Sequence, residues 1–497
     1  MGLGASLLSK DSVSSKSPED ALYLDYSPRN LAIFTNCFSV GYAMYYILAP
    51  ISFYMIDELD APAQKQGVVT GLMFLPWGLK LAWGLIIDTA YGGKRKIFLP
   101  IGWGLFVVSN LVLICLVKPS ILPLAFLTFL STIGYVMADV ATDAMMVERS
   151  KQCERTAHRG QLQARAYIAR FAGGTVGCIV GAVLYNKDAW GWGLPFWGVL
   201  CVYIATPILF IAPWYIPLLE LEDTDEEGNP IVPESITISA QFGVLYNLFQ
   251  QTACWKPCTF IFLYNMSLLI NPAWNSFLVC GLGFSNFALA MLTLLGNLLA
   301  YLALVCYKKY FFETSWRKIY LWCTALYLFF TSLQYVLIFK LNDDWNMGAQ
   351  GYAIFFAMSS YGMVQFIQAI QFLPSCRLYL ALCPKGSEGT TYAMLTSLAN
   401  LASTTTYPLA ASLSTIWDVR NDTLDDGDYD GMWKLTLLCS AFVLPTLLLI
   451  DWLPDGMDDV VASVESGEVN KRAGTALTAV VALALVFTIG FTLITII

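Results

Sequence analysis

Long apolar runs dominate the chain, and short polar segments separate one run from the next. A helix needs roughly 20 mostly apolar residues to cross the hydrocarbon core of a bilayer, and twelve runs reach that length. The pattern therefore predicts transmembrane helices at 31–55, 67–87, 97–117, 122–147, 161–185, 193–216, 257–279, 285–306, 318–340, 352–375, 390–416 and 432–453. A last run, 473–497, is long enough for a thirteenth helix.

The order of the runs, six followed by a hydrophilic stretch and then six more, suggests two related halves. Weak internal symmetry supports this, because the basic turn 94–96 after the second run has a counterpart in Arg317 and Lys318 before the ninth. This is the organisation of major-facilitator carriers. We therefore predict an all-α membrane protein with 6+6 transmembrane helices in two pseudo-symmetric halves and an extra C-terminal helix.

The same pattern divides the chain into six segments. They are a cytosolic N-terminal tail (1–28), an N-terminal six-helix half (29–217), a cytosolic central loop with a surface helix (218–256), a C-terminal six-helix half (257–453), a polar linker (454–472) and the extra transmembrane helix (473–497).

Basic residues gather in the loops that are cytosolic in this arrangement, and cytosolic loops of membrane proteins carry an excess of Lys and Arg. The N-terminus is therefore predicted to be cytosolic, in either the plasma membrane or an organelle membrane. The glycosylation sequon that begins at Asn421 then lies on the outside. Gly2 and Ser6 fit the pattern for myristoylation.

Composition rules out most other classes of protein. Hydrophobic residues make up 57% of the chain and charged residues 13%, against about 25% charged residues in soluble domains. This excludes a soluble enzyme, a nucleic-acid binder and a secreted disulfide module. The chain has one histidine, so it cannot form the histidine pair of an HExxH metal site, and no cofactor is predicted. A membrane enzyme or a channel is a remote alternative to a carrier.

Charged side chains inside the apolar runs are the first candidates for function, because each costs about 2.5–3.5 kcal/mol at the bilayer centre on insertion scales. Lys80, Gly84 and Asp88 repeat every four residues in the second run and share one helix face. Asp88 precedes a glycine-containing basic turn, and this arrangement resembles the major-facilitator loop motif, in which a carboxylate latches neighbouring helices. The resemblance implies that Asp88 is a latch that closes a gate rather than a substrate contact. In the fourth run, Asp139 and Asp143 are also four apart and lie on one face.

The fifth run carries Arg165 and Arg170 ahead of a glycine ladder. Gly173, Gly177 and Gly181 have a spacing that lets another helix approach closely. A rise of about 1.5 Å per residue puts Arg170 near the middle of the bilayer.

The same count puts Lys80 and Asp139 at similar depths, where they can form an ion pair. Three roles are open for these charges. They can hold the first six helices together or gate the inner mouth. Lys80 or Arg170 can bind an anionic substrate directly, and Asp139 can act as a protonatable coupling site.

The second half contains neutral amides instead. Asn271 precedes Pro272 near the centre of the seventh run, and this pair predicts a break that leaves backbone groups facing a cavity. Gln365, Gln368 and Gln371 are spaced three apart along one stripe of the tenth run. These amides can hydrogen-bond the edge of a flat heterocycle or a neighbouring helix.

Four motifs follow one another along the chain. Three are Pro76-Trp77-x-x-Lys80 with Gly84 and Asp88, Asp139-x-x-x-Asp143, and Arg170 before the glycine ladder. The most specific holds Leu373-Pro374, Cys383-Pro384-Lys385-Gly386-Ser387-Glu388-Gly389-Thr390, Ala393, Ser397 and Asn400. Together they resemble the folate–biopterin transporter family of the major facilitator superfamily. Two features depart from that family: Leu81 stands where proline is common, and the thirteenth run exceeds the usual twelve.

The resemblance implies a major-facilitator fold and the carriage of folates or pterins, coupled to protons, by alternating access around a central site. Relatives include carriers of S-adenosylmethionine, which is the alternative substrate. The expected partners are the small-molecule substrate, protons and the lipid bilayer, with a monomeric chain and no nucleic acid. The candidates for substrate binding are Lys80, Arg170, Asn271, Gln365, Gln368, Trp77 and Trp274, and those for coupling or gating are Asp139, Asp143, Asp88, Arg165 and Glu388.

Overall fold

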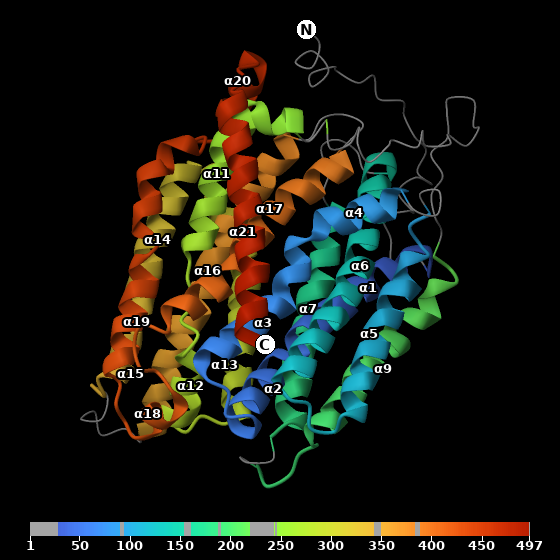
Figure 1. Ribbon diagram of the computed structural model, residues 1–497. Coiled ribbons are helices and arrows are strands. Elements are labelled where there is room, and N and C mark those ends of the chain that lie inside the picture. The colour runs from blue at the N-terminus through green and yellow to red at the C-terminus, as the bar shows by residue number, and fades with distance from the viewer. Residues whose placement is uncertain are drawn as a thin grey trace.

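The computed structural model describes residues 28–89, 94–153, 161–186, 190–218, 246–341, 349–382 and 388–496, together with Gly243. Within these ranges the chain is almost entirely helical, and its β-structure is a single antiparallel bridge between Gln251 and Val469. Figure 1 shows the helices as one elongated bundle.

The N-terminal half supplies the blue to green helices of Figure 1. They are α1 (Pro28–Tyr46), α2 (Leu48–Phe53) continued by the π-helical turn η2 (Tyr54–Glu58), α3 (Ala63–Gly78), α4 (Lys80–Thr89), α5 (Phe98–Cys115), α6 (Ile121–Cys153), α7 (Gln161–Leu184) and α9 (Phe196–Tyr215).

The C-terminal half supplies the yellow to red helices. They are α11 (Thr252–Ser267), α12 (Trp274–Ser276) continued by η5 (Phe277–Gly281), α13 (Asn286–Cys306) continued by η6 (Tyr307–Phe311), α14 (Trp316–Ser332), α15 (Gln334–Ile338), α16 (Ala349–Leu382), α17 (Glu388–Leu413), α18 (Asn421–Asp425), α19 (Asp430–Ala441), the 3-10 helix η7 (Leu444–Trp452), α20 (Met457–Ser466) and α21 (Lys471–Ile496).

Nine helices in the described ranges are long and apolar enough to cross a membrane. The remaining predicted spans, the second, seventh, tenth and eleventh, correspond to α3 with α4, α11 with α12, α16 and α17. The second and seventh are interrupted, and α17 is rich in Ser and Thr. The chain is therefore an all-α, multi-pass membrane protein, while its total of thirteen spans stays a prediction.

The seventh span is broken where the sequence predicts. Helix α11 ends at Ser267, and helical structure resumes at Trp274. Pro272 has no backbone N–H to continue the helix, and Asn271 accepts a hydrogen bond from the N–H of Ala273 at 2.9 Å. The predicted break is confirmed. The helix itself begins at Thr252, ahead of the predicted position 257.

The glycine ladder of α7 packs against α1. A Cβ atom on Gly173, Gly177 or Gly181 would collide with the backbone of α1 at Phe38, Tyr42 and Tyr46. Only glycine permits this approach, so the two helices form a tight pair in the N-terminal half. The close approach predicted from the glycine spacing is confirmed.

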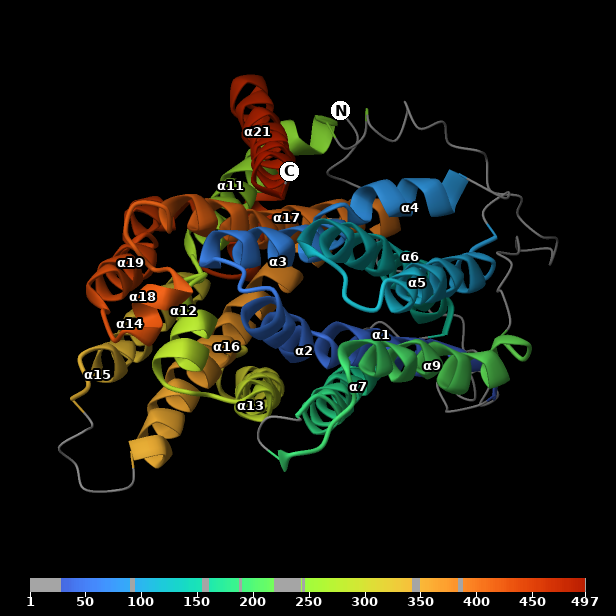
Figure 2. The same ribbon diagram turned by 60° about the horizontal axis from the view of Figure 1, so that its bottom comes forward.

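The two halves meet along two pairs of helices. Helix α3 packs on α17, and α7 packs on α13. Figure 2 shows these two pairs on opposite sides of the bundle. Helix α21 lies against α17 and α3 on the first of these sides, where the hydroxyls of Thr405 and Thr488 are 3.0 Å apart and buried.

The segment before α21 contains an element that the sequence analysis did not predict. Helix α20 lies within the predicted polar linker and buries Val460. The next residues pair with the start of α11, since the N–H of Thr252 donates to Glu468 O at 2.9 Å and the N–H of Asn470 donates to Gln250 O at 2.8 Å. This anchors α21 to the C-terminal half.

Candidate functional site

The second span is interrupted immediately before its charged residue, Lys80. Pro76 lies inside α3, α3 ends at Gly78, and α4 starts at Lys80. The carbonyl of Pro76 accepts hydrogen bonds from the N–H of Leu79 at 3.2 Å and from the indole Nε1 of Trp83 at 3.3 Å. These bonds satisfy a backbone carbonyl that the break in the helix would otherwise leave without a hydrogen bond in apolar surroundings.

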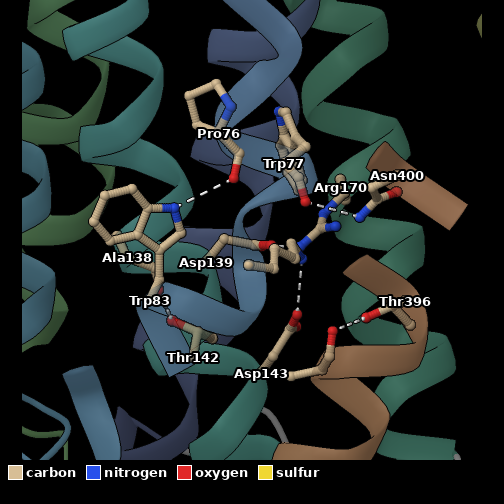
Figure 3. A network of polar contacts seen from close by, with 12 residues as sticks. Pro76, Trp77, Trp83, Ala138, Asp139, Thr142, Asp143, Arg170, Thr396 and Asn400 are labelled. Carbon is tan, nitrogen blue, oxygen red and sulfur yellow. Dashed lines mark hydrogen bonds and ion pairs between the residues drawn. The ribbon is translucent and has the colours of Figure 1, made fainter. Parts of the chain in front are cut away.

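Lys80 forms the centre of a cluster of four charged side chains from three helices. Its Nζ atom lies 2.7 Å from Asp139 Oδ2 and 3.3 Å from Asp143 Oδ2. The guanidinium of Arg170 on α7 contacts the other carboxylate oxygen of Asp139. The pairing of Lys80 with Asp139 that the depth count predicts is present, and Figure 3 shows the surroundings of the two aspartates and Arg170.

The two aspartates of this cluster differ in environment. Asp139 has two cationic partners and a side chain that is 0% exposed, whereas Asp143 is 33% exposed and, among the described residues, forms an ion pair with Lys80 only. Lys80 and Arg170 are 10% and 15% exposed. Two cations and two carboxylates give a formally balanced cluster, and Asp143 is its most accessible member.

Aromatic rings border the two cations. The centroid of the Trp77 ring is 4.7 Å from Lys80 Nζ and 5.9 Å from Arg170 Cζ. The ring of Tyr167, one turn before Arg170 on α7, is 5.3 Å from the same Cζ. Such positions over the ring favour cation–π attraction. Within the part of the chain that the structure describes, the Nε1 atom of Trp77 and the Nε atom of Arg170 are buried and make no hydrogen bond.

A second polar network holds α6 in place beside the cluster. Asn36 on α1 is fully buried and donates to Thr142 Oγ1 at 2.8 Å and to Ala138 O at 3.3 Å. It also accepts a bond from Trp103 Nε1 at 2.7 Å. Thr142 and Ala138 flank Asp139 and Asp143 in sequence, so this network fixes the helix that carries both aspartates.

The C-terminal half reaches the cluster through α17. Asn400 Nδ2 donates to the carbonyl of Trp77 at 3.3 Å, and Thr404 Oγ1 donates to the carbonyl of Phe74 at 3.3 Å (Figure 3). Leu401 packs against Gly78, where an added Cβ would lie 3.0 Å from Leu401 Cα. The break in the second span therefore lies at the interface of the two halves.

The amide candidates of the C-terminal half have other partners. Asn271 Nδ2 donates to Thr436 Oγ1 at 2.9 Å, and its Oδ1 accepts a hydrogen bond from the N–H of Ala273, where its own span is broken. Gln371, the third glutamine of the stripe, donates to the hydroxyl of Tyr264 at 2.6 Å. These two amides join helices to one another. Gln365 and Gln368 are half-buried on α16.

The remaining candidates lie outside the cluster or outside the described side chains. Trp274 is buried in α12 against Phe277, with ring centroids 5.4 Å apart. Arg165 lies half-buried on α7, on the same helix as Arg170. Asp88 belongs to α4 and Glu388 to α17, but the side chains of both fall outside the part of the structure that is described. Their predicted gating roles stay predictions.

Polar contacts also join the halves at the end of the bundle that carries α18. Asn421 Nδ2 donates to Asp60 Oδ1 at 2.8 Å, and Gln66 Nε2 donates to Ser276 Oγ at 2.8 Å. Asn421 is 8% exposed, so the nitrogen to which a glycan would be attached is buried in this contact. We refer to this region as the α18 end.

Three residues that contact or support the cluster were not predicted from the sequence. Asn36 is an isolated amide in the first apolar run, and a polar residue at such a position was the only indication in the sequence that it forms a buried contact. Tyr167 precedes Arg170 by three positions, which places it on the same helix face. Asn400 belongs to the longest sequence motif, but nothing in the sequence indicates that it bonds to Trp77.

The BT1 family model matches residues 41–474 of the chain. A folate-biopterin transporter of Synechocystis is 24% identical over 417 residues, which cover 84% of this chain and 80% of the relative. Probable folate-biopterin transporter 6 of Arabidopsis thaliana is 24% identical over 428 residues, covering 83% and 80%. Folate transporter 1 of Plasmodium falciparum is 21% identical over 410 residues, covering 80% and 74%.

Solved structures share the fold. The crystal structure of a D-xylose–proton symporter superposes with a TM-score of 0.60 at 14% sequence identity, covering 86% of this chain and 98% of the other. A nucleoside transporter gives a TM-score of 0.59 at 9% identity, covering 85% and 98%. At these identities the likeness concerns the fold alone, which is that of solved transporters, while the exact 6+6 division with a thirteenth helix stays a prediction.

Proposed function

The chain belongs to the BT1 family, and on that premise we propose that it is a secondary active transporter that carries folates or pterins across a membrane, driven by protons. The observation that carries the proposal is the buried cluster around Lys80. Four charged residues at the centre of a membrane bundle would be costly without a function. The cluster lies beside Trp77, whose carbonyl accepts a hydrogen bond from Asn400 on α17 of the other half. A carrier with two moving halves needs its substrate site close to such a contact.

The substrate chemistry follows from the side chains of the cluster. Lys80 and Arg170 supply positive charge for the carboxylates of a folate. The rings of Trp77 and Tyr167 border these cations and supply flat apolar surfaces on which a pteridine can stack. The buried Nε1 of Trp77 and Nε of Arg170 are donors that a bound substrate can satisfy. A folate has both the acidic groups and the heterocycle that this set of residues would bind.

Charge balance links substrate binding to a proton. The cluster is formally neutral, so a carboxylate added to it would be an uncompensated buried anion. Protonation of one aspartate removes this imbalance. The geometry favours Asp143 for this step over Asp139, because Asp143 is more exposed and, among the described residues, pairs with one cation rather than two. A proton on Asp143 then leaves Lys80 available to the substrate.

Alternating access supplies the remaining part of the proposal. The halves are joined at the α18 end by the contacts of Asn421 with Asp60 and of Gln66 with Ser276. Rocking of the halves would break these bonds and open that end. Because these two bonds are polar, water can replace them at modest cost in free energy.

Tracer uptake into proteoliposomes tests the substrate assignment. Labelled folic acid would be challenged separately with unlabelled biopterin and with S-adenosylmethionine. Saturable folate uptake that biopterin inhibits and S-adenosylmethionine does not would support the proposal. Saturable transport of S-adenosylmethionine without folate uptake would overturn the substrate class, and uptake that never saturates would indicate a channel.

A further inference from the structure

An asparagine on α13 joins the C-terminal half to the turn of α7 that follows Arg170. Asn297 Nδ2 donates to the carbonyl oxygen of Phe171 at 3.2 Å and to Thr175 Oγ1 at 3.1 Å. Gly174 leaves room for this approach, since a Cβ added there would lie 3.2 Å from Asn297 Nδ2. Phe171 comes directly after Arg170, so the C-terminal half forms a hydrogen bond next to a cation of the ion-pair cluster.

The amide of Asn297 is costly where it lies. Its residue is 3% exposed in a helix that is long and apolar enough to cross a membrane. Its Oδ1 atom is buried and makes no hydrogen bond within the described ranges. An unsatisfied polar atom in apolar surroundings destabilises the fold, and packing alone would be served better by an apolar side chain. A polar residue inside a membrane bundle therefore points to a role beyond packing.

The hydrogen bond fixes Arg170 relative to the C-terminal half. The backbone of α7 already contacts α1 at this level, because a Cβ on Gly41 would collide with the carbonyl of Arg170. Helices α1 and α7 therefore carry Arg170 as one unit. Asn297 holds that unit against α13, together with the ring of Tyr301, whose centroid is 6.1 Å from that of Phe171.

A counterpart lies on the other side of the bundle, where Asn400 donates to the carbonyl of Trp77. Helix α3 packs on α17 and α7 packs on α13, on opposite sides (Figure 2). The Trp77 ring centroid and Arg170 Cζ are 5.9 Å apart, and each of these residues belongs to a helix that an asparagine ties to the C-terminal half. The C-terminal half thus influences the spacing between the ring and the cation.

We propose that Asn297 is a positioning residue for Arg170, and that it holds the guanidinium at the distance from the Trp77 ring that an acidic heterocyclic solute requires. The inference rests on the proposed function, in which Arg170 binds a carboxylate of the solute. A pterin without a carboxylate does not use Arg170 and so does not depend on Asn297. Because Asn297 acts through Arg170, its contribution to affinity disappears when Arg170 is removed.

A double-mutant cycle tests this dependence. Equilibrium binding of labelled folic acid, and its competition by biopterin, would be measured on the full-length protein in detergent for the wild type, Asn297→Ala, Arg170→Ala and the double variant. Asn297→Ala should lower the affinity for folate about two- to tenfold, as the loss of one hydrogen bond does, and leave the affinity for biopterin unchanged. In the Arg170→Ala background the same substitution should cause no further loss.

Two more variants complete the experiment. Thr293→Ala is the matched control, since Thr293 lies one turn before Asn297 and its hydroxyl donates to the carbonyl of Leu289 on its own helix. It should bind both solutes as the wild type does. Thr175→Val keeps the shape of the side chain and removes one partner of Asn297. It should lower the affinity for folate about twofold, and it replaces Asn297→Ala if that variant does not fold.

The outcomes separate the inference from the proposed function. Equal losses of affinity for folate and biopterin, or a loss for folate that persists in the Arg170→Ala background, would show that Asn297 has a structural role only and would overturn the inference alone. A wild type that binds no folate would overturn the proposed function and the inference with it.

Discussion

Asn400 on α17 donates a hydrogen bond to the backbone carbonyl of Trp77 on α3, at 3.3 Å, and so links the C-terminal half to the ring beside Lys80 and Arg170. The ring touches the cations, and the backbone of the same residue touches the other half. A movement of α17 would therefore displace Trp77 and, with it, the ring that contacts the two cations of the ion-pair cluster.

Replacing Asn400 tests this link. Asn400→Ala should lower the maximal uptake rate about two- to tenfold with little change in substrate affinity, because one hydrogen bond is worth about 0.5–1.5 kcal/mol. Thr396→Ala is the matched control, since the hydroxyl of Thr396 bonds only to carbonyls of α17 among the contacts described. Equal effects of the two substitutions on the maximal rate would argue against the link.

The two aspartates should contribute unequally to stability. Asp139→Asn leaves Lys80 and Arg170 buried without their shared anion, and breaking a buried ion pair costs about 3–5 kcal/mol. Asp143→Asn removes one partner from Lys80 at a partly exposed position and should cost less. Thermal unfolding of the purified protein in detergent measures both. A larger decrease in Tm for Asp143→Asn would show that the burial argument is wrong.

Arg170 should distinguish acidic from neutral substrates. If its guanidinium binds a carboxylate, Arg170→Ala will lower the affinity for glutamylated folate about tenfold or more relative to the affinity for bare pterin. This corresponds to the 1.5–3 kcal/mol that a hydrogen bond to a charged group contributes. Competition uptake gives both affinities. Equal losses for folate and pterin would point to a structural or gating role for Arg170.

The contact of α1 with α7 should tolerate no side chain. In Gly177→Ala the new Cβ would lie 2.7 Å from Tyr42 O and 3.1 Å from Tyr42 Cα, so two helix backbones would have to separate. We expect a clear decrease in Tm and in the yield of monodisperse protein, measured by size-exclusion chromatography. Gly490→Ala, which meets open space, should behave as wild type. A stable Gly177→Ala protein would mean that the helices are less closely packed.

Much of the fold is accessible from the sequence because bilayer geometry leaves few choices. Apolar length predicts the helices, Asn271 with Pro272 predicts the broken span, and the glycine spacing predicts the tight contact of α7. The pairing of Lys80 with Asp139 follows from counting helix rise along two runs, since charges at one depth in lipid have little else to bind.

The rest depends on contacts that no local pattern encodes. Asp139 and Asp143 share a helix face, and their different exposure is set by the neighbouring helices. Asn271 and Gln371 have the same chemistry as a substrate-binding amide, yet Thr436 and Tyr264 already bind them. The partner of Asn400 is a backbone carbonyl more than three hundred positions away in the chain. Sequence spacing predicts which residues share one face of a helix, but it does not predict which neighbouring helix that face contacts.

Proton-driven folate uptake tests the central claim most directly. The initial rate of labelled folate uptake into proteoliposomes would be measured with and without an inward proton gradient, for the wild type and for Asp143→Asn. We predict that the gradient stimulates the wild type, while Asp143→Asn exchanges folate at equal concentrations but gains nothing from the gradient. The account would be contradicted if the gradient did not change the rate of folate uptake by the wild type. It would also be contradicted if the gradient stimulated Asp143→Asn as strongly as the wild type.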